Sequence, residues 1–263
     1  MLLEIQNLSV SYGNHTKESV KNVNLTMRKS EIVSVVGESG SGKTTLVRSI
    51  LGLLPAGGSV TNGDIRFEEN SLLSYTKKQW LQLRGSEISM IFQDSGAMLN
   101  PIHKIETQFI SYIRDHRKIS RKEAGEMAAE MLERMRLADV KNVLNSYPFQ
   151  LSGGMRQRVG IAMAMTFQPK LLLADEPTSA LDVTTQAQIV RQMMELREKY
   201  GTSIILVTHN IGVAAYMGDK ILVMKNGAVV DSGGREHILH HSADPYTRNL
   251  MLAVPSLEGE HYD

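Results

Sequence analysis

The feature that most constrains this chain is a glycine-rich turn between an apolar segment and a segment with helical spacing. Residues 32–50 read IVSVVGESGSGKTTLVRSI, in which residues 37–44 match the pattern G-x-x-x-x-G-K-[ST]. A chance glycine-rich turn would not require a β-branched strand before it and a helix after it, so the context favours a phosphate-binding loop. In such a loop the backbone N–H groups face inward, the lysine reaches the β- and γ-phosphates, and the threonine hydroxyl meets Mg²⁺. The nucleotide-binding residues predicted here are Gly37, Ser39, Gly40, Gly42, Lys43, Thr44 and Thr45.

Length and composition limit the classes of protein that this chain can represent. Its 263 residues suffice for one large α/β domain or two small ones. The 29 lysines and arginines nearly balance the 28 acidic residues, and this net charge of +1 makes nucleic acid an unexpected partner. The absence of cysteine excludes disulfides, iron–sulfur ligation and thiolate zinc sites. Because we find no signal-peptide pattern and no apolar run of membrane-spanning length, we expect a soluble, cytosolic protein that meets a membrane only through a partner.

The first 35 residues alternate in the manner of β-strands. Strands are predicted over residues 3–10, 20–27 and 32–36, with a turn around Gly13 and Asn14. We therefore expect a small antiparallel sheet that leads into the phosphate loop. Tyr12 lies beside the turn, where its ring could stack on a purine or could pack as a half-buried strand residue. Local sequence alone favours the half-buried strand residue.

The middle of the chain is predicted to be helical. Apolar residues recur at helical spacing from Ile102 to Leu144, and the methionines among them are expected to fill the apolar core. Tyr147 and Pro148 then break the pattern. The flanking elements are predicted as a loop at 57–63, strands at 64–67 and 88–92, and a helix that opens at 151–155 and runs to 165.

An alternation of strands and helices follows. The segment LLLADEP at 171–177 is apolar until it ends in two acids, which indicates a buried parallel strand that delivers carboxylates at its carboxyl end. A helix over 184–200 and a strand over 203–208 continue this rhythm, and Asn226-Gly227 predicts a hairpin. The pattern predicts an α/β fold whose ligand lies at the carboxyl ends of the parallel strands.

Phosphoryl transfer to water needs a metal ligand, a group that orients the water and positive charge near the transition state. Asp175 is predicted to bind Mg²⁺ and Glu176 to act as a general base, because the apolar residues before them disfavour an exposed acidic pair. Gln93 ends its own predicted strand and could touch both metal and water, although a lone glutamine is usually not functional. His209 could contact the γ-phosphate or could be a structural histidine, and local sequence does not decide between them.

A second candidate anion site lies at Ser152, Gly153 and Gly154, where a helix is predicted to begin. Consecutive glycine N–H groups and a serine hydroxyl suit an anion. Two arrangements would explain a second site. Either one nucleotide touches both sites within one molecule, or two copies pair so that the loop of one faces the Ser-Gly-Gly segment of the other.

Six motifs, together with Tyr12, occur in the order and at the spacing of a known family. They are GESGSGKTT at 37–45, Gln93 in IFQD, LSGGMRQR at 151–158, LLLADEP at 171–177, SALD at 179–182 and His209 in VTHN. Over almost its whole length the chain therefore resembles the ATP-binding subunits of ABC transporters. The resemblance implies an ATPase that uses ATP and Mg²⁺.

The resemblance also implies a fold and a domain organisation. The fold would be α/β, a P-loop NTPase core with a parallel sheet, an N-terminal antiparallel β subdomain and an inserted α-helical subdomain. Residues 1–263 would form a single ABC ATPase domain. Its core and β subdomain would comprise residues 1–93 and 166–263, and its helical subdomain residues 94–165.

Roles that the residues alone leave open follow from the same resemblance. Tyr12 would stack on adenine, Gln93 would be the Mg²⁺ and coupling glutamine, and His209 would be the switch histidine. Asp182 would belong to the loop that contacts the opposite site. The resemblance thus implies catalytic roles for Glu176, His209 and Gln93, and metal binding by Thr44, Gln93 and Asp175.

The resemblance further implies a head-to-tail dimer and a set of partners. ATP bound at Lys43, Thr44 and Gln93 of one subunit would be capped by Ser152 and Gly154 of the other. The partners would be a second ATPase subunit, identical or different, together with two integral-membrane permeases and an extracytoplasmic solute-binding protein. A short helix from a permease would insert near Gln93. The complex would place this chain peripherally at the cytoplasmic face of the cell membrane.

Finer features resemble the peptide and nickel importer branch of the family. They are FQDSGAMLNP at 92–101, Met155 and ADPYTRNLMLAVP at 243–255. Because the chain ends before the cysteine-bearing extension of many peptide-type members, it most resembles nickel or metallophore subunits, and the expected cargo is nickel or a metal chelate, an oligopeptide or a dipeptide. The alternative is a soluble non-transport ABC ATPase, although the coiled-coil insertion of repair types and the second cassette of ribosome types are both absent. An unrelated phosphate-loop kinase would lack residues 151–155.

Overall fold

The computed structural model describes residues 1–13, 17–93, 95–179 and 181–252. Parts of the predicted motifs lie outside these residues, namely Asn14, Asp94, Ala180 and residues 253–255. The chain groups into two compact units, one formed by Met1–Ser74 with the chain from Ile205 onward, and one formed by Tyr75–Ile204. The division falls inside strand β8 (Ser203–Val207).

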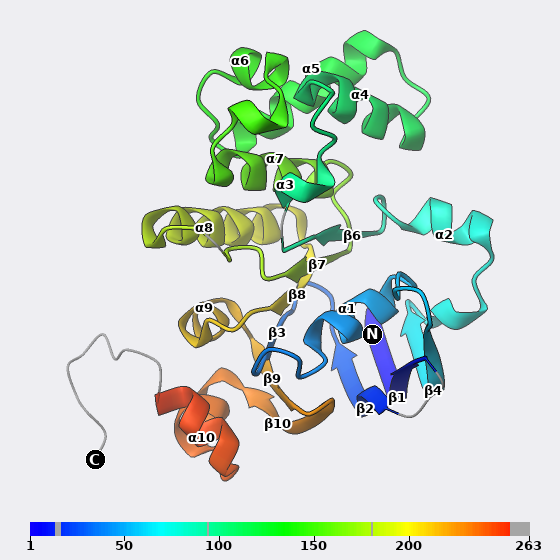
Figure 1. The fold of residues 1–263 in the computed structure, drawn as a ribbon, viewed down its shortest axis with the longest axis vertical. Helices are drawn as coiled ribbons and strands as arrows, with labels where there is room; N and C mark the ends of the chain where they lie inside the picture. The colour runs from blue at the N-terminus through cyan, green and yellow to red at the C-terminus, as the bar shows by residue number, and fades with distance from the viewer. Residues whose placement is uncertain (14–16, 94, 180, 253–263) are drawn as a thin grey trace. The chain divides into compact units, whose positions relative to one another are not determined.

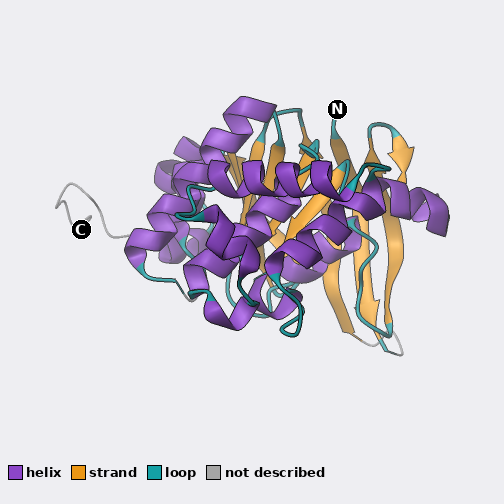
Figure 2. Ribbon diagram, turned by 90° about the horizontal axis from the view of Figure 1, so that it is seen from above, coloured by secondary structure: helices purple, strands orange, loops and turns teal. Residues whose placement is uncertain are grey.

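The first unit contains a four-stranded antiparallel sheet in the order β2-β1-β4-β5, which holds the strands near the N-terminus in Figures 1 and 2. Leu3, Ile5, Leu8 and Val10 of β1 are buried, because the apolar face of the sheet packs into the core. The predicted small antiparallel sheet is therefore confirmed. Its strands are β1 (Leu3–Tyr12), β2 (Lys17–Met27), β4 (Gly58–Phe67) and β5 (Asn70–Ser71).

The loop predicted at 57–63 is wrong for most of its length, because β4 already begins at Gly58. β4 pairs with β1 from Tyr12 opposite Gly58 to Leu3 opposite Phe67. The register shifts where Gly63 adopts a φ of +88°. A glycine inside a strand marks an irregularity of the ladder here, and pairing with β1 overrides the local turn signal.

A second group of strands in the first unit carries the phosphate loop. β3 (Ile32–Val36) is buried throughout and pairs in parallel with β9 (Lys220–Lys225), which forms a hairpin with β10 (Ala228–Gly234). The predicted hairpin at Asn226-Gly227 is confirmed, and both residues have positive φ, as a type I′ turn requires. The helices of this unit are α1 (Lys43–Ile50), η1 (Leu72–Ser74), α9 (Ile211–Met217), η3 (His237–His241) and α10 (Pro245–Leu252).

The second unit combines two parallel strands with helices (Figure 1). β6 (Ile88–Ile91) pairs in parallel with β7 (Leu171–Asp175), so the predicted buried parallel strand before the two acids is confirmed. Ser203, at the start of β8, donates its N–H to the Lys170 carbonyl at 2.9 Å. The helices include α2 (Lys77–Leu83), α3 (Ser95–Met98), η2 (Pro148–Gln150), α7 (Gly153–Met165) and α8 (Val183–Tyr200).

The stretch predicted as helical from Ile102 to Leu144 is three separate helices. They are α4 (Ile105–His116), α5 (Arg121–Arg134) and α6 (Val140–Asn145). Ser120 begins α5 through a capping box with Glu123, and Asp139 caps α6 from a left-handed conformation. The periodicity detected the helices but not these caps.

The helical subdomain expected at 94–165 lies within the second unit, which also contains β6, β7 and α8. Its bounds, and those of the core expected at 1–93 and 166–263, stay predictions.

Candidate functional site

The phosphate loop joins β3 to α1 in the first unit. Gly37 follows the buried strand with a φ of +145°, and Gly42 precedes the helix with a φ of +102°. An added Cβ would lie less than 3.0 Å from the Met224 carbonyl oxygen at Gly37, and less than 3.0 Å from the Ser19 carbonyl oxygen at Gly42. Glycine at these two positions therefore allows the loop to pack closely on its neighbouring backbone.

Lys43 is buried, with 6% of its surface exposed. Its Nζ donates to the carbonyl oxygens of Gly37 and Glu38, both at 2.7 Å, and lies 3.4 Å from Ser41 Oγ. The ammonium is therefore held by the backbone of the loop itself. A phosphate that entered this loop would meet a cation whose position is already restrained.

The N-terminus of α1 lacks a side-chain cap, because its N-cap residue is Gly42. The N–H groups of a first helical turn carry the positive end of the helix dipole. Thr44 and Thr45 lie half-buried in this turn, and Ser39 and Gly40 are exposed at the loop. Together with Lys43, these groups fit the phosphates of a nucleotide.

Tyr12 lies close to the first turn of α1. Its hydroxyl is 3.4 Å from Thr45 Oγ1, and its side chain is half-buried. Gly58 allows the ring to lie there, because an added Cβ at Gly58 would be 2.6 Å from Tyr12 Cε1. The structure thus brings Tyr12 to the phosphate loop, and its predicted stacking on adenine stays a prediction.

His209 follows the end of β8, where the chain runs beside β3. Thr208 donates its N–H to the Val35 carbonyl at 3.2 Å, two residues before the phosphate loop begins. His209 is exposed, and Asn210 then caps α9 by accepting the Val213 N–H at 3.1 Å. The strand predicted over 203–208 is confirmed as β8, which ends two residues before His209, and the expected contact of His209 with a γ-phosphate stays a prediction.

The predicted catalytic acids lie at the end of β7 in the second unit. Asp175 is 2% exposed, and Glu176 follows it in a left-handed conformation with a φ of +47°. Gln93, in the segment that follows β6, donates from Nε2 to Glu176 Oε2 at 3.3 Å. Two residues 83 positions apart in the sequence are therefore brought together, because they follow two strands, β6 and β7, that pair in parallel.

Ser152 is the N-cap of α7, where its Oγ accepts the Met155 N–H at 3.2 Å. Ser152 and Gly153 are exposed, so this helix start is accessible. The predicted helix start at Ser-Gly-Gly is confirmed. Its expected contact with a second copy stays a prediction.

Asp182 caps the next helix, α8. It accepts both the N–H and the hydroxyl of Thr185, at 2.9 and 2.6 Å. These hydrogen bonds hold the pKa of Asp182 below its usual value, because they favour the charged carboxylate. An added Cβ at Gly154 would lie 2.8 Å from Thr185 Cγ2. Thr185 therefore bonds to Asp182 and lies where a side chain at Gly154 would clash with it, and the Asp-x-x-Thr spacing was the signal that would have identified it.

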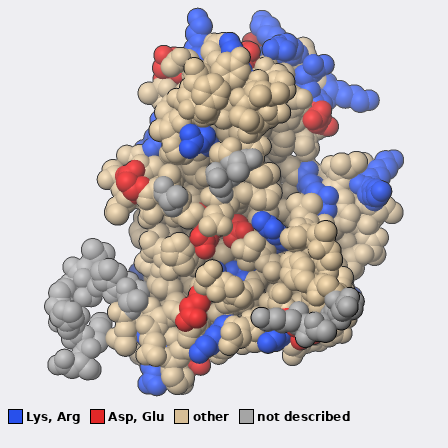
Figure 3. All heavy atoms as spheres, viewed as in Figure 1, with Lys and Arg blue, Asp and Glu red and all other residues tan. Residues whose placement is uncertain are grey.

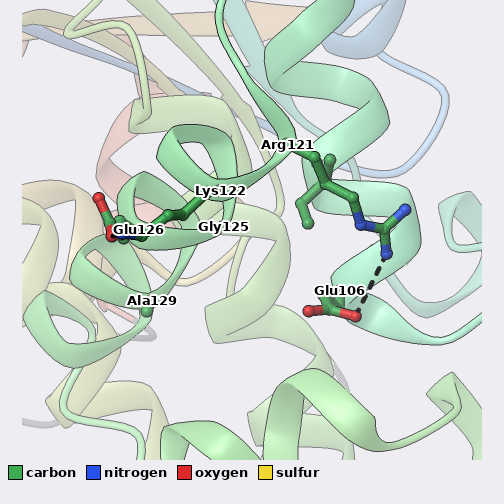
Figure 4. Close-up of a pocket in the computed structure, with 7 residues that line it drawn as sticks. Glu106, Arg121, Lys122, Gly125, Glu126 and Ala129 are labelled. Atoms are coloured by element: carbon green, nitrogen blue, oxygen red, sulfur yellow. Dashed lines mark ion pairs between the residues drawn. The ribbon is translucent and has the colours of Figure 1, made fainter.

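A shallow hollow of about 550 Å³ lies on α4 and α5 (Figure 4). Arg121 forms an ion pair with Glu106 across it at 3.6 Å, and Lys122 lies 3.9 Å from Glu126. The hollow offers both signs of charge and suits a phosphate chain less well than the loop does. Lysine and arginine side chains gather over this end of the second unit (Figure 3), and those exposed near the α4–α5 connection are Arg114, Arg117, Lys118, Arg121 and Lys122.

Within the described parts of the chain, every helix is too short or too polar to cross a membrane.

Comparison with known proteins gives consistent results. The ABC transporter family model matches residues 20–179. The oligopeptide transport ATP-binding protein AppD of Bacillus subtilis (strain 168) is 41% identical over 98% of this chain and 80% of its own length. The probable D,D-dipeptide transport ATP-binding protein DdpD of Escherichia coli (strain K12) is 41% identical over 97% of this chain and 78% of its own.

Solved structures show the same relationship. A dimeric structure of the ATP-binding cassette MJ0796 in a post-hydrolysis state, bound to ADP and Pi, has a TM-score of 0.79 at 31% identity and covers 89% of this chain and 99% of that one. CbiO1 from Clostridium perfringens, part of the transporter complex cbiONQ, has a TM-score of 0.78 at 27% identity and covers 90% of each chain. This chain therefore belongs to the ABC transporter family, with the P-loop ATPase cassette fold, as an ATP-binding subunit of the branch that contains the oligopeptide and dipeptide transport proteins.

Proposed function

We propose that this chain hydrolyses ATP to power the import of oligopeptides or dipeptides through partner permeases. The phosphate loop supports the ATPase part, because Lys43 is restrained by the loop backbone beside an uncapped helix N-terminus. The names of the relatives support the peptide part. Nickel and metal chelates, which the end of the chain led us to expect, find no support in those names, so we propose peptide as the cargo.

Each predicted site residue has a role in this proposal. Lys43 neutralises charge on the β- and γ-phosphates, and Tyr12 stacks on the adenine. Glu176 takes a proton from the attacking water, and its hydrogen bond from Gln93 restrains the position of the side chain. His209 contacts the γ-phosphate.

The side chains also suit Mg²⁺. A hydroxyl, an amide oxygen and a carboxylate are ligands of the kind that Mg²⁺ takes alongside phosphate oxygens. The proposed set is Thr44, Gln93 and Asp175, of which Asp175 is a buried carboxylate at the end of a strand. When bound, the metal would offset the negative charge that develops on the phosphates.

The assembly that we propose contains two ATPase subunits, identical or different. Ser152, Gly153 and Gly154 of one subunit, with Asp182, complete the site of the other, which the exposed start of α7 permits. Two integral-membrane permeases and an extracytoplasmic solute-binding protein complete the importer, and the chain sits peripherally at the cytoplasmic face of the membrane. The transport names of the relatives favour this assembly over a soluble, non-transport ATPase.

An uptake assay tests the proposal. In the organism that produces this protein, the wild-type chain would be replaced by the Glu176→Gln variant, and the uptake of a labelled tripeptide and of nickel would be measured. The matched control is Glu198→Gln, at an exposed residue. We expect Glu176→Gln to abolish peptide uptake and to leave nickel uptake unchanged. Loss of nickel uptake alone would contradict peptide as cargo, and unchanged uptake of both would contradict a role in import.

A further inference from the structure

The C-terminal helix α10 contacts the phosphate loop within the first unit. Asp244 lies just before α10 and accepts the Thr247 N–H at 2.7 Å, which begins the helix. Tyr246 is the second residue of α10, and its hydroxyl oxygen accepts the N–H of Glu38 at 3.0 Å. Glu38 follows the first glycine of the loop, so the helix reaches the loop across 208 residues of sequence.

This hydrogen bond acts on the same peptide group that restrains Lys43. The N–H of Glu38 and the C=O of Gly37 belong to one planar peptide unit. Lys43 Nζ donates to that carbonyl at 2.7 Å, while the N–H donates to Tyr246. Because the N–H and C=O of a trans peptide point in opposite directions, Lys43 and Tyr246 hold this unit from two sides. Rotation of the peptide would turn the carbonyl away from Lys43.

The ring of Tyr246 is itself held in place. The Lys225 ammonium lies 4.4 Å from the ring centroid, a cation–π contact. The ring packs against an apolar cluster that includes Val36, the last residue of β3, and Ile238. Burial raises the pKa of Tyr246, so the hydroxyl stays neutral at physiological pH.

The start of α10 is tied to the hairpin of β9 and β10. Ser242 accepts the Asp244 N–H at 3.3 Å and donates its hydroxyl to Asp231 on β10. Hydrogen bonds to Thr247 hold the pKa of Asp244 below its usual value, so Asp244 remains a charged cap. The start of α10, which carries Tyr246, is therefore held to β10 by a chain of hydrogen bonds.

We propose that Tyr246 is a positioning residue for the phosphate loop. It orients the Gly37–Glu38 peptide so that Lys43 and the loop N–H groups are arranged for a polyphosphate before one binds, which lowers the ordering cost of binding. The inference rests on the proposed function of this loop as the ATP site. It gives a physical role to the Pro-Tyr-Thr segment, which in the sequence marks the family branch.

Binding measurements on the purified full chain test this role. The probes would be ATP and inorganic tripolyphosphate, titrated calorimetrically well below the melting temperature. Tyr246→Phe removes only the hydroxyl, and we expect both affinities to fall about five-fold with little change in melting temperature, as for the loss of one neutral hydrogen bond. The matched control is Tyr216→Phe, at a residue that is 60% exposed, and it should change neither affinity.

Two further variants distinguish the contribution of the loop to affinity from the contributions of neighbouring residues. Lys225→Met should lower both affinities about two-fold, because it removes only the cation over the ring. Tyr12→Ala should weaken the binding of ATP more than that of tripolyphosphate, since tripolyphosphate has no adenine. Unchanged affinities in Tyr246→Phe would overturn the inference, and so would a lower melting temperature with unchanged affinities. If the wild-type chain bound neither probe, the proposed function would fail and the inference with it.

Steady-state kinetics of the assembled complex provide a second readout. Among the residues that the structure describes, the Tyr246 hydroxyl bonds to the backbone of Glu38 and to no proposed catalytic side chain. Tyr246→Phe should therefore raise the KM for ATP several-fold and leave kcat nearly unchanged. A fall in kcat with an unchanged KM would contradict a positioning role.

Discussion

Replacing Gly37 with alanine should destabilise the protein far more than the same replacement at Gly40. Both glycines lie in the phosphate loop with positive φ, at +145° and +78°. An added Cβ at Gly37 would lie less than 3.0 Å from the Met224 carbonyl oxygen, whereas an added Cβ at Gly40 would have nothing within 4 Å. The pair therefore separates a steric cost from a conformational one.

The two costs can be assigned magnitudes. A non-glycine residue with positive φ costs about 1–2 kcal/mol. A gain of about 0.4–1 kcal/mol, from lower entropy of the unfolded chain, offsets part of this cost. Gly40→Ala should therefore lose about 1 kcal/mol. At Gly37, the Cβ and the Met224 carbonyl oxygen must also separate by about 1.3 Å to reach the 3.4 Å of ordinary contact. Moving buried backbone in this way adds about 1–3 kcal/mol, for a total of about 2–4 kcal/mol.

Thermal and urea unfolding of the purified chain without nucleotide would measure the difference. At about 2–4 °C per kcal/mol for a chain of this size class, Gly37→Ala should lower the melting temperature by about 5–15 °C and Gly40→Ala by less than about 4 °C. Urea midpoints should fall in the same order at an unchanged m-value. Equal losses in the two variants would refute the steric argument, because both variants change the same residue type at positive φ.

Three other outcomes are expected. Glu176→Gln should abolish steady-state hydrolysis and retain ATP binding; retained turnover in a phosphate-release assay would exclude Glu176 as the base. A Ser152→Arg chain mixed with a Lys43→Ala chain should recover one working site; verified heterodimers without hydrolysis would contradict a site shared between copies. Asp182→Asn should lower the melting temperature at neutral pH. Because the folded pKa of Asp182 is depressed, this stabilisation is present above its unfolded value of about 4 and is lost as the pH falls through the folded value. Unfolding curves that stayed equally separated at low pH would contradict it.

Local patterns predicted those parts of the molecule that local physics determines. The phosphate loop was identifiable because strand, glycines and lysine must follow one another directly. The acids after β7 were identifiable because an apolar run that ends in carboxylates can only place them at a strand end. The type I′ hairpin at Asn226-Gly227 was identifiable because both central residues need positive φ.

Features that depend on distant partners were not visible in the sequence. β4 begins at Gly58 because β1 lies beside it, which overrides the local turn signal. The three helices between Ile105 and Asn145 were merged because a periodicity window averages over caps such as Ser120. The contact of Tyr246 with Glu38 joins residues 208 positions apart, and no local pattern reports such a contact.

The backbone of Glu176 has a consequence for engineering this protein. Its φ of +47° lies in a region that glycine occupies without strain and that costs a residue with a Cβ about 1 kcal/mol. Glu176→Gly should therefore raise the stability of the fold, because it removes this conformational cost, while it also removes the proposed base. A screen that rewarded heat resistance alone would favour loss of the carboxylate, so directed evolution of this chain needs activity and stability to be selected together.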